Sequence, residues 1–236
     1  MKLTFLGSSH GVPEPRRKCS CTMIETNGRY YLVDVGTAPI DELAVRGIPV
    51  DAVKGIFVTH MHGDHTNGLI PFLDLISWKF KTAEPTVYLP NAQARTAIEG
   101  WISVNGVTLR DIPILQVEPG VIFDDGFLKV TAIPTQHIQA SYAYFVEADG
   151  KSVLFTGDLK HPSVDFPAVE KKTNLYICEA AHFDPVAYKP IFEAADVERI
   201  CFNHYANRHV GSIMTLAADN ALPPISLATD GFEINL

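Results

Sequence analysis

Short apolar stretches recur along the chain, separated by clusters of glycine, proline and polar residues, and this pattern predicts many short strands. Asn27-Gly28 is a strong two-residue turn signal, so the strands on either side of it are expected to form a hairpin. Helices are predicted in fewer places, near residues 39–46, from residue 66 through residue 76, at 92–100 and at 212–222. The predicted strands lie near residues 2–7, 22–26, 30–35, 55–59, 86–89, 142–147, 152–156, 175–178, 200–203, 225–228 and 232–235, and three more short strands are predicted within residues 112–133. Because the strands come in meandering groups with helices between the groups, the chain does not follow a strict β-α-β repeat.

One turn carries most of the candidate chemistry, the segment His60-Met61-His62-Gly63-Asp64-His65. A buried strand is predicted directly before it and an amphipathic helix directly after it. Neutral imidazole and carboxylate groups are both good ligands for divalent transition metals. A polar loop without metal is the alternative, but this pattern of histidines and aspartate is rare by chance. Four ligands on one turn cannot all bind a single ion without strain, so the pairs His60/His62 and Asp64/His65 are predicted to serve two neighbouring ions.

The H-x-H-x-D-H pattern of this turn is the signature of the metallo-β-lactamase fold superfamily, and the chain resembles that superfamily from end to end. The resemblance implies an α/β fold, a four-layer αββα sandwich of two mixed β-sheets with outer helices. It also implies that the metals lie at one edge of the sandwich, on loops that follow strand ends. A chain of 236 residues can bury a sizeable core, and a single hydrolase domain over residues 1–236 is expected.

The resemblance implies three further ligands, each of which follows a predicted strand. His137 matches the superfamily's third-motif histidine, and Asp158 matches the carboxylate that bridges both ions. The pattern between them resembles the tRNA 3′-processing endonucleases and the phosphodiesterase of phosphonate metabolism. His204 fits the final histidine ligand of that phosphodiesterase. In the tRNA-processing enzymes a similar histidine donates a proton and the last ligand lies nearer the C-terminus, where this chain has Ala228-Thr229-Asp230-Gly231 and no histidine. His204 is therefore expected to be the last ligand.

The implied site holds two divalent metal ions, and zinc or manganese suits its nitrogen and oxygen ligands equally well. The ions share Asp158, and the remaining ligands are His60, His62 and His137 for one ion and Asp64, His65 and His204 for the other. Asp64 is expected to take part in catalysis as well as in metal binding. His182 also follows a predicted strand, and it matches a general-acid histidine proposed for the phosphodiesterase relatives. A histidine that is merely satisfied by its surroundings is the alternative for His182.

Two features lie outside this set. Cys19-Ser20-Cys21 resembles part of a structural zinc site in the phosphonate-pathway enzyme, but Ile24 replaces the third cysteine and Asn207 its partner histidine. Two cysteines cannot hold a closed tetrahedral zinc, so free thiols are expected. His10, in the first loop, is expected to face solvent, with contact to the substrate as the alternative.

Net charge and apolar content limit the classes of molecule that the chain is expected to bind. The formal net charge is −8 and the longest basic run is Arg16-Arg17-Lys18, so the chain lacks the basic face on which broad nucleic-acid binding depends. A small-molecule substrate is therefore expected, and nucleic acid is disfavoured. A local basic patch near the site is the alternative, because bound metal ions supply positive charge that the count omits. No apolar run approaches the roughly 18 residues of a membrane span, and the first residues are too few for a signal-peptide core. Four cysteines do not make a disulfide framework in a chain of this length. A cytoplasmic location is the default expectation, and a homodimer is left open.

The leading hypothesis is a dinuclear metal-dependent hydrolase, a phosphodiesterase that uses a metal-bridging hydroxide on a small phosphodiester. Phosphodiesters are preferred because the motifs outside the metal turn resemble those of phosphodiesterases. Hydrolysis of a lactone, thioester or amide at the same site is the first alternative. A tRNA 3′-processing endonuclease is less favoured, because no inserted glycine- and basic-rich arm is found. A non-catalytic metal-binding protein is the alternative from another class.

Overall fold

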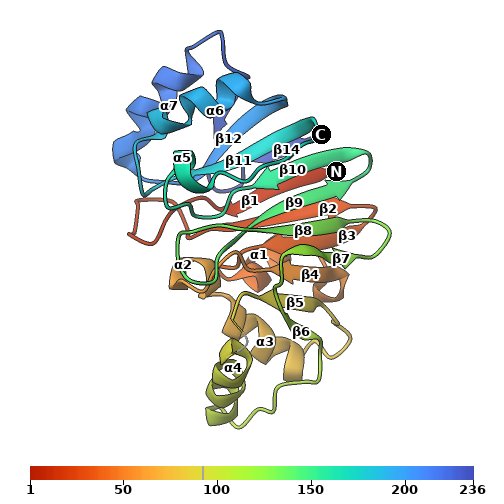
Figure 1. The fold of residues 1–236 in the computed structure, drawn as a ribbon. Coiled ribbons are helices and arrows are strands. Elements are labelled where there is room, and N and C mark those ends of the chain that lie inside the picture. The colour runs from red at the N-terminus through yellow and green to blue at the C-terminus, as the bar shows by residue number, and fades with distance from the viewer. Residues whose placement is uncertain (92) are drawn as a thin grey trace.

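Two seven-stranded β-sheets face each other in the computed structural model of the protein, which describes residues 1–91 and 93–236 (Figure 1). The strand order is β14-β1-β2-β3-β4-β5-β6 in the first sheet and β13-β12-β11-β10-β9-β8-β7 in the second. Helices cover the outer faces of the sheets. This is the four-layer sandwich of two mixed sheets that the sequence predicted, and the fold prediction is confirmed.

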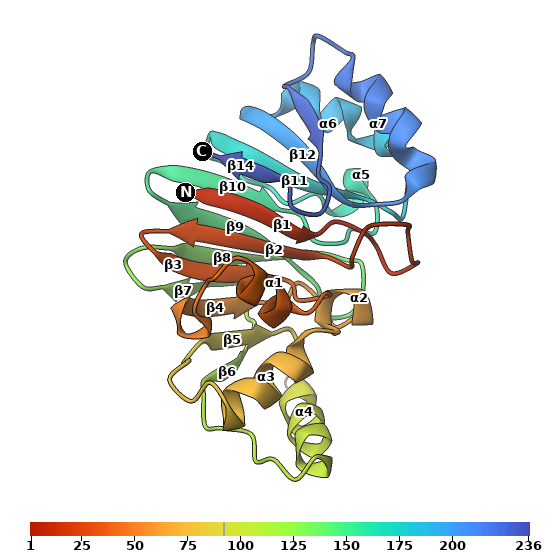
Figure 2. The same cartoon turned by 180° about the vertical axis from the view of Figure 1, so that it is seen from behind.

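The first sheet is antiparallel from β14 to β3 and parallel from β3 to β6. Asn27 and Gly28 turn the chain between β2 and β3 with φ angles of 50° and 71°, as the turn signal predicted. The chain ends meet in this sheet, where the Leu236 N–H donates to the Met1 carbonyl at 3.1 Å (Figure 2). Its strands are β1 (Lys2–Gly7), β2 (Cys21–Thr26), β3 (Arg29–Val33), β4 (Val53–Phe57), β5 (Thr86–Leu89), β6 (Ile114–Gln116) and β14 (Glu233–Asn235).

The second sheet is antiparallel from β7 to β10 and parallel from β10 to β13. Its two longest strands, β11 and β12, run two residues further at their C-terminal ends than the sequence pattern predicted, so Glu179 and His204 belong to strands. The strands of this sheet are β7 (Gly120–Asp124), β8 (Lys129–Pro134), β9 (Tyr142–Ala148), β10 (Lys151–Phe155), β11 (Thr173–Ala180), β12 (Val197–Tyr205) and β13 (Ile225–Leu227).

Helices α1, α3 and α4 pack on the outer face of the first sheet, and α6 and α7 pack on that of the second (Figures 1 and 2). The helix predicted over residues 92–100 begins at Gln93 and continues to Val104; residue 92 lies outside the described residues. The helices are α1 (Pro39–Val45), α2 (Gly63–Thr66), α3 (Leu69–Trp78), α4 (Gln93–Val104), α5 (Pro162–Asp165), α6 (Lys189–Ala194) and α7 (Val210–Ala217). Single 3₁₀ turns lie at η1 (Val50–Ala52), η2 (Pro185–Tyr188) and η3 (Asn207–His209).

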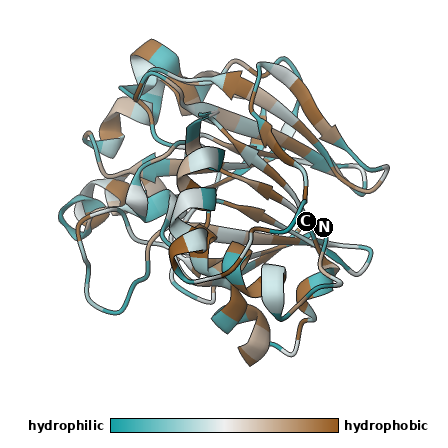
Figure 3. Cartoon of the chain, turned by 90° about the horizontal axis from the view of Figure 1, so that it is seen from below, coloured by the Kyte–Doolittle hydropathy of each residue, from teal (hydrophilic) through white to brown (hydrophobic). Residues whose placement is uncertain are grey.

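Three apolar cores separate the four layers, and the strand period decides which core each residue joins. In β3, Leu32 faces the helices of the first sheet, whereas Tyr31 and Val33 face the second sheet. In β4, Ile56 faces the helices of the first sheet and Phe57 faces the second sheet. Because both faces of these strands are covered, most of their residues are hydrophobic (Figure 3). The polar site described next lies at the edge of this apolar interior.

Candidate metal centre

The predicted ligands follow or end strands of both sheets. His60 and His62 follow β4, and Asp64 and His65 lie on the short helix α2 just beyond it. The second sheet supplies one residue after β8, one after β10 and one at the end of β12, namely His137, Asp158 and His204. These seven residues form two groups, and within each group the candidate ligand atoms lie within 4.8 Å of one another. The fold therefore brings together every residue of the predicted ligand set.

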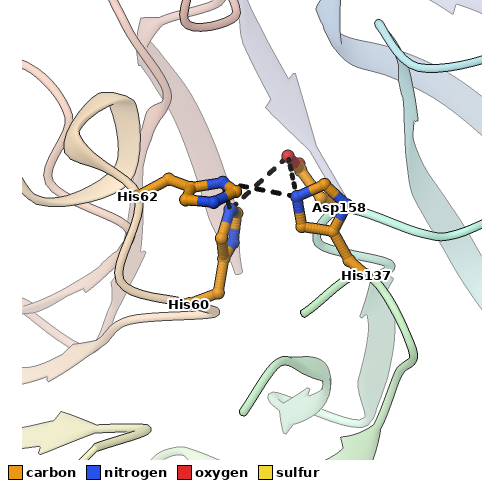
Figure 4. A group of neighbouring side chains, drawn as sticks. All are labelled: His60, His62, His137 and Asp158. Carbon is orange, nitrogen blue, oxygen red and sulfur yellow. Dashed lines mark hydrogen bonds and ion pairs between the residues drawn. The ribbon is translucent and has the colours of Figure 1, made fainter. Parts of the chain in front are cut away.

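The first group contains His60, His62, His137 and Asp158, whose side chains point toward one another from opposite sides of the site (Figure 4). His60 Nε2 lies 2.9 Å from His62 Nδ1, and His137 Nε2 lies 3.3 Å from that same His62 nitrogen. Asp158 Oδ2 lies 3.6 Å from His60 Nε2 and 3.7 Å from His137 Nε2. Two nitrogens bound tetrahedrally to zinc are about 3.3 Å apart, so the group has the spacing that such an ion requires.

The second group contains Asp64, His65 and His204. His65 Nε2 lies 3.1 Å from His204 Nε2, and His204 Nε2 lies 3.0 Å from Asp64 Oδ2. The other oxygen of Asp158, Oδ1, lies 3.5 Å from His65 Nε2 and 3.4 Å from His204 Nδ1. Asp158 thus turns one carboxylate oxygen to each group, the arrangement that a bridging carboxylate requires.

Two buried polar atoms at the centre are placed as ligands of a cation would be. Within the described part of the chain, Asp158 Oδ1 and His204 Nδ1 are buried without a hydrogen-bond partner. A buried polar atom left unpaired costs roughly 1–3 kcal/mol, so such atoms are rare unless something else satisfies them. His204 is also held with a positive φ of 51°, a strained conformation for a non-glycine residue. A neutral or anionic donor set of this kind fits divalent metal ions.

The protonation states also suit metal binding. Burial lowers the pKa of His60 to about 2, with the charges of neighbouring histidines acting in the same direction. Burial likewise lowers the pKa of His137. Both imidazoles are therefore neutral at pH 7 and keep a lone pair for a ligand bond. For Asp158, burial acts to raise the pKa, but the charges of His204 and His65 outweigh it and hold the pKa well below its usual value. The carboxylate is thus ionised.

Asp34 is a functional residue that the sequence reasoning missed. It follows β3 with a positive φ of 57°, and its side chain is buried. Its Oδ2 accepts a hydrogen bond from His65 Nδ1 at 2.8 Å, and its Oδ1 accepts one from the Thr59 N–H at 2.8 Å. Burial acts to lower the pKa of His65, but the charges of Asp34 and Asp158 outweigh it and leave the pKa well above its usual value. Because Asp34 accepts from Nδ1, Nε2 is the nitrogen left for the second group, and a bound cation would displace its proton. The available signal was the position of an aspartate directly after a buried strand.

Glu179 is the second residue that was missed, and it orients His182. Its Oε1 lies 2.9 Å from His182 Nδ1, and its two oxygens also accept the Leu159 N–H at 3.0 Å and the Ala181 N–H at 2.8 Å. His182 Nε2 faces the centre at 3.7 Å from Asp158 Oδ2. Burial acts to lower the pKa of His182, but the hydrogen bond and charge of Glu179 outweigh it and leave the pKa raised. His182 can therefore hold a proton at Nε2; it also forms a third group of ligand type with Asp158 and His204, so the ligand role stays open.

Two glycines let the backbone approach the centre. Gly157 has a φ of 59°, and a Cβ on it would lie 2.8 Å from the Tyr142 carbonyl, so another residue would displace the neighbouring Asp158. Gly11 lies against Asp64, where a Cβ would stand 3.1 Å from the carboxylate carbon. The first loop therefore touches the second group.

His10 does not face solvent as expected, because the first loop folds over it. It is buried, its Nε2 lies 3.3 Å from Glu14 Oε1, and Glu14 in turn accepts the Asn207 N–H at 2.9 Å. Its ring lies 6.2 Å from that of His204, between centroids. His161 and His209, the two remaining histidines, form hydrogen bonds with the backbone: His161 caps α5, and His209 Nδ1 donates to the Ala180 carbonyl at 2.8 Å. All four cysteines are free thiols.

The chain matches a family model, and three of the many proteins that it resembles are compared with it below. Residues 1–187 match the family model described as "Anti-Pycsar protein Apyc1". The ribonuclease Z of Listeria innocua is 33% identical over 177 residues, which cover 73% of this chain and 58% of that enzyme. The metallo-β-lactamase fold protein YhfI of Bacillus subtilis has a TM-score of 0.78 at 17% identity, over 99% of this chain and 98% of that one. A diphosphatase of the PhnP family has a TM-score of 0.71 at 19% identity, over 100% and 97% of the two chains. The chain thus spans less than two thirds of the length of the curated relatives that it matches first.

These relatives correct one prediction. The acidic net charge of −8 and the absence of a long basic run disfavoured nucleic acid as a substrate, yet the curated relatives with 33% identity are ribonucleases. The inference was wrong because net charge describes the whole surface, whereas an active site that holds metal ions supplies positive charge locally. Composition therefore does not exclude RNA.

None of the helices in residues 1–91 and 93–236 has the length and apolarity that a bilayer crossing requires. The two-sheet sandwich and the similarity to YhfI show that the chain has the metallo-β-lactamase fold, as its H-x-H-x-D-H turn predicted. The match of the family model over residues 1–187 shows that the chain belongs to the family of the anti-Pycsar protein Apyc1.

Proposed function

We propose that the protein is a dinuclear metal-dependent hydrolase that cleaves phosphodiester bonds. One observation carries the proposal: Asp158 turns Oδ2 to His60 and His137 and Oδ1 to His65 and His204. A buried carboxylate divided in this way between two groups of nitrogen ligands is suited to two neighbouring cations. A centre for a single ion would use only one of the two groups of candidate ligands.

The proposed ligands divide between the two ions as the sequence suggested. His60, His62 and His137 bind one ion, Asp64, His65 and His204 bind the other, and Asp158 binds both. Zinc and manganese both fit these nitrogen and oxygen donors. When bound, two such cations lower the pKa of water and neutralise charge on phosphoryl oxygens. Asp64 contributes to catalysis in this proposal by fixing the ion that lies nearest the first loop.

His182 is proposed as the proton donor to the leaving oxygen. It lies in the mouth of the site, in a hollow of about 320 Å³ that Asp64, Asp158 and His204 also line. Glu179 accepts a hydrogen bond from His182 Nδ1–H, and this bond orients Nε2 toward the hollow. Because the pKa of His182 is raised, the donor form is present to higher pH than for an ordinary histidine.

The mouth favours a phosphodiester over a neutral ester. Arg208 lines the same hollow and is held by a hydrogen bond from its guanidinium to the Ala181 carbonyl at 2.7 Å. A guanidinium at the entrance attracts an anionic phosphate, whereas a lactone or thioester gains little from it. The relatives support the same choice, since the curated relatives are ribonucleases and one structural neighbour is a diphosphatase. Both small phosphodiesters and RNA ends are therefore candidate substrates.

Metal analysis and a substrate panel test the proposal. Purified protein supplied with zinc or manganese is expected to hold about two ions per chain and to hydrolyse bis(p-nitrophenyl) phosphate. Asp158→Asn is expected to lose metal and activity together, whereas the exposed Asp184→Asn serves as a matched control and keeps both. RNA with a 3′ extension, a lactone and a thioester complete the panel. Hydrolysis of the lactone or thioester alone would contradict a phosphodiesterase, and a firm value of one ion per chain would contradict a dinuclear centre.

A further inference from the structure

The first loop, residues 8–20 between β1 and β2, projects from the sandwich at the same edge as α2 and α7 (Figures 1 and 2). Asp230 joins the two ends of this loop. Its Oδ1 accepts the N–H and the hydroxyl of Ser8 at 3.0 and 2.8 Å, and its Oδ2 accepts the Lys18 N–H at 2.8 Å. Because one carboxylate holds both ends, the residues between them form a closed loop whose position depends on what its middle part contacts.

The first loop covers the second group of proposed ligands and leaves the first group open. Gly11 lies against the Asp64 carboxylate, and the ring of His10 packs edge-on against that of His204, with 6.2 Å between centroids. In the first group His62 is exposed, whereas His204 in the second group is buried. The first group therefore has a side open to solvent, and the second group lies beneath the loop.

Asn207, three residues after His204, connects the loop to the end of β12. Glu14 Oε1 accepts the Asn207 N–H at 2.9 Å, and Glu14 Oε2 accepts a hydrogen bond from the side-chain amide. The carbonyl oxygen of that amide accepts a hydrogen bond from Arg17 at 2.9 Å. The Asn207 N–H holds the pKa of Glu14 below its usual value, so Glu14 is ionised and only accepts, whereas a guanidinium only donates. The amide therefore fits between the two charges in one orientation; we call these contacts of Asn207 with Glu14 and Arg17 the clasp.

Arg17 makes further contacts that hold the loop on β12. Its guanidinium carbon lies 3.9 Å from the centroid of the Tyr205 ring, and one of its nitrogens donates to the Tyr205 carbonyl at 2.8 Å. Another nitrogen donates to the Ser8 carbonyl at 3.1 Å. A guanidinium on an aromatic face gains a cation–π contact in addition to its hydrogen bonds. Arg17 thus joins the middle of the loop, its N-terminal end and the strand that carries His204.

The clasp also orients the side chain that packs on the second group. Glu14 Oε1, which accepts the Asn207 N–H, lies 3.3 Å from His10 Nε2, and the Val12 N–H donates to His10 Nδ1 at 3.3 Å. Because Nδ1 is an acceptor, Nε2 carries the ring proton and donates it to Glu14. The ring of His10 is thereby fixed against His204, so loss of the clasp frees the part of the loop that covers the second group.

We propose that Asn207 is a positioning residue that fastens the first loop over the second group and so retains the ion bound there. Release of that ion requires the loop to lift from Asp64 and His204. The release rate therefore follows the fraction of molecules in which the clasp is open. The ion of the first group leaves without this step. The inference rests on the proposed function, because it takes the second group as the site of a metal ion.

Asn207→Asp tests the clasp with almost no change in side-chain volume. The new carboxylate still accepts from Arg17, but it repels Glu14 instead of donating to it. Loss of this charge-assisted hydrogen bond is expected to speed the release of one of the two ions roughly 10- to 100-fold and to leave the rate of the other unchanged. The measurement is the time course of zinc transfer from loaded protein to an excess of a chromogenic chelator. The matched control is Asn174→Asp, which also places a carboxylate against a glutamate, Glu198, but at the end of β11 far from the site, and it is expected to keep both rates.

A second substitution separates the clasp from a general loss of structure. Glu14→Gln added to Asn207→Asp restores a donor opposite the new carboxylate, so the double variant is expected to regain most of the wild-type retention. Hydrogen exchange of residues 9–18 in metal-free protein reports the opening of the loop without reference to the ions. It should be faster in Asn207→Asp than in the wild type and should slow again in the double variant.

Unchanged release of both ions in Asn207→Asp would overturn the inference and leave the dinuclear hydrolase standing. Faster release that Glu14→Gln does not reverse would overturn it as well. If the wild-type protein holds a single ion, the dinuclear proposal fails, and the clasp stands only if Asn207→Asp speeds the release of that ion. A wild-type protein that binds no metal would overturn both.

Discussion

Replacement of Asp34 by asparagine is expected to weaken the binding of one of the two proposed metal ions more than that of the other. In the native chain Asp34 Oδ1 accepts the Thr59 N–H at 2.8 Å, and Oδ2 accepts His65 Nδ1–H at 2.8 Å. An asparagine that keeps the first bond turns its NH₂ group toward His65. Nδ1 of His65 then becomes the acceptor, and the ring proton moves to Nε2. Nε2 loses the lone pair that faces His204, so the ion in the second group loses a ligand.

The size of this effect follows from the contacts. Loss of a partner that orients a metal-bound histidine typically lowers metal affinity about 10- to 100-fold. His62 and His137 have no hydrogen bond to Asp34, and His60 is linked to it only through the Thr59 hydroxyl, which lies 3.1 Å from His60 Nδ1 and 3.0 Å from both Asp34 oxygens. The ion of the first group is therefore expected to lose less affinity than the ion of the second. The protein should also lose roughly 1–3 kcal/mol of folding free energy, because Asp34 is buried and accepts hydrogen bonds from the Thr59 N–H and hydroxyl and from His65. The metal and stability effects can be separated.

Equilibrium dialysis over a range of free zinc, with thermal unfolding of the same samples, measures both effects. The matched control is Asp165→Asn, a buried aspartate that accepts the Gln136 N–H at 2.7 Å and contacts no proposed ligand side chain. Asp165→Asn should lose stability and keep both ions. If Asp34→Asn binds both ions with wild-type affinity while folded, or loses both equally, the assignment of the His65 tautomer to Asp34 is refuted.

Four other substitutions test the roles assigned to neighbouring residues. Glu179 holds the pKa of His182 raised against the effect of burial, so Glu179→Gln should lower that pKa. The alkaline limb of the kcat–pH profile should then move to lower pH while both metals stay bound. His182→Ala should slow turnover by roughly 10²- to 10⁴-fold, with a smaller loss for nitrophenolate leaving groups. Gly11→Ala places a Cβ 3.1 Å from the Asp64 carboxylate carbon and should weaken one ion, which zinc titration will show as a change in one of two affinities. Burial acts to raise the pKa of Asp125, but hydrogen bonds outweigh it and leave the pKa lowered. The stability that Asp125 contributes is therefore present above its unfolded pKa and is lost as pH falls through the lower folded pKa. Asp125→Asn should cost roughly 1–3 kcal/mol of unfolding free energy in urea at pH 7 and progressively less in acid.

The metal turn could be read from the sequence because its chemistry is local. His60, His62, Asp64 and His65 are near neighbours in the chain, and a buried strand before them fixes where they emerge. His137, Asp158 and His204 stand at strand ends, but only the resemblance to known metalloenzymes selected them among similar turns. Their spacing along the chain carries no information about distance in space.

Asp34 could not be assigned from the sequence, because its partners are distant in the chain. Thr59 is 25 residues away and His65 is 31 residues away, and only the parallel pairing of β3 with β4 brings them beside Asp34. Glu179 was within reach, since it lies three residues before His182. It was overlooked because the strand was predicted to end at residue 178, which left Glu179 as an ordinary loop carboxylate. The longer strand holds its side chain inward.

The site depends on the closed sandwich more than on either sheet. The first sheet supplies His60, His62, Asp64 and His65 through β4 and α2, and the second supplies His137, Asp158 and His204 through β8, β10 and β12. Each proposed ion therefore takes ligands from both sheets, and Asp158 joins the two ions. Any slip of one sheet over the other separates both groups at once, because neither sheet carries a complete one. Metal binding in this arrangement favours the packed sandwich over more open states, since ions that bind only the assembled site stabilise the assembly by their own binding free energy. The apolar core between the sheets and the polar cluster at their edge thus specify the same relative position of the two layers.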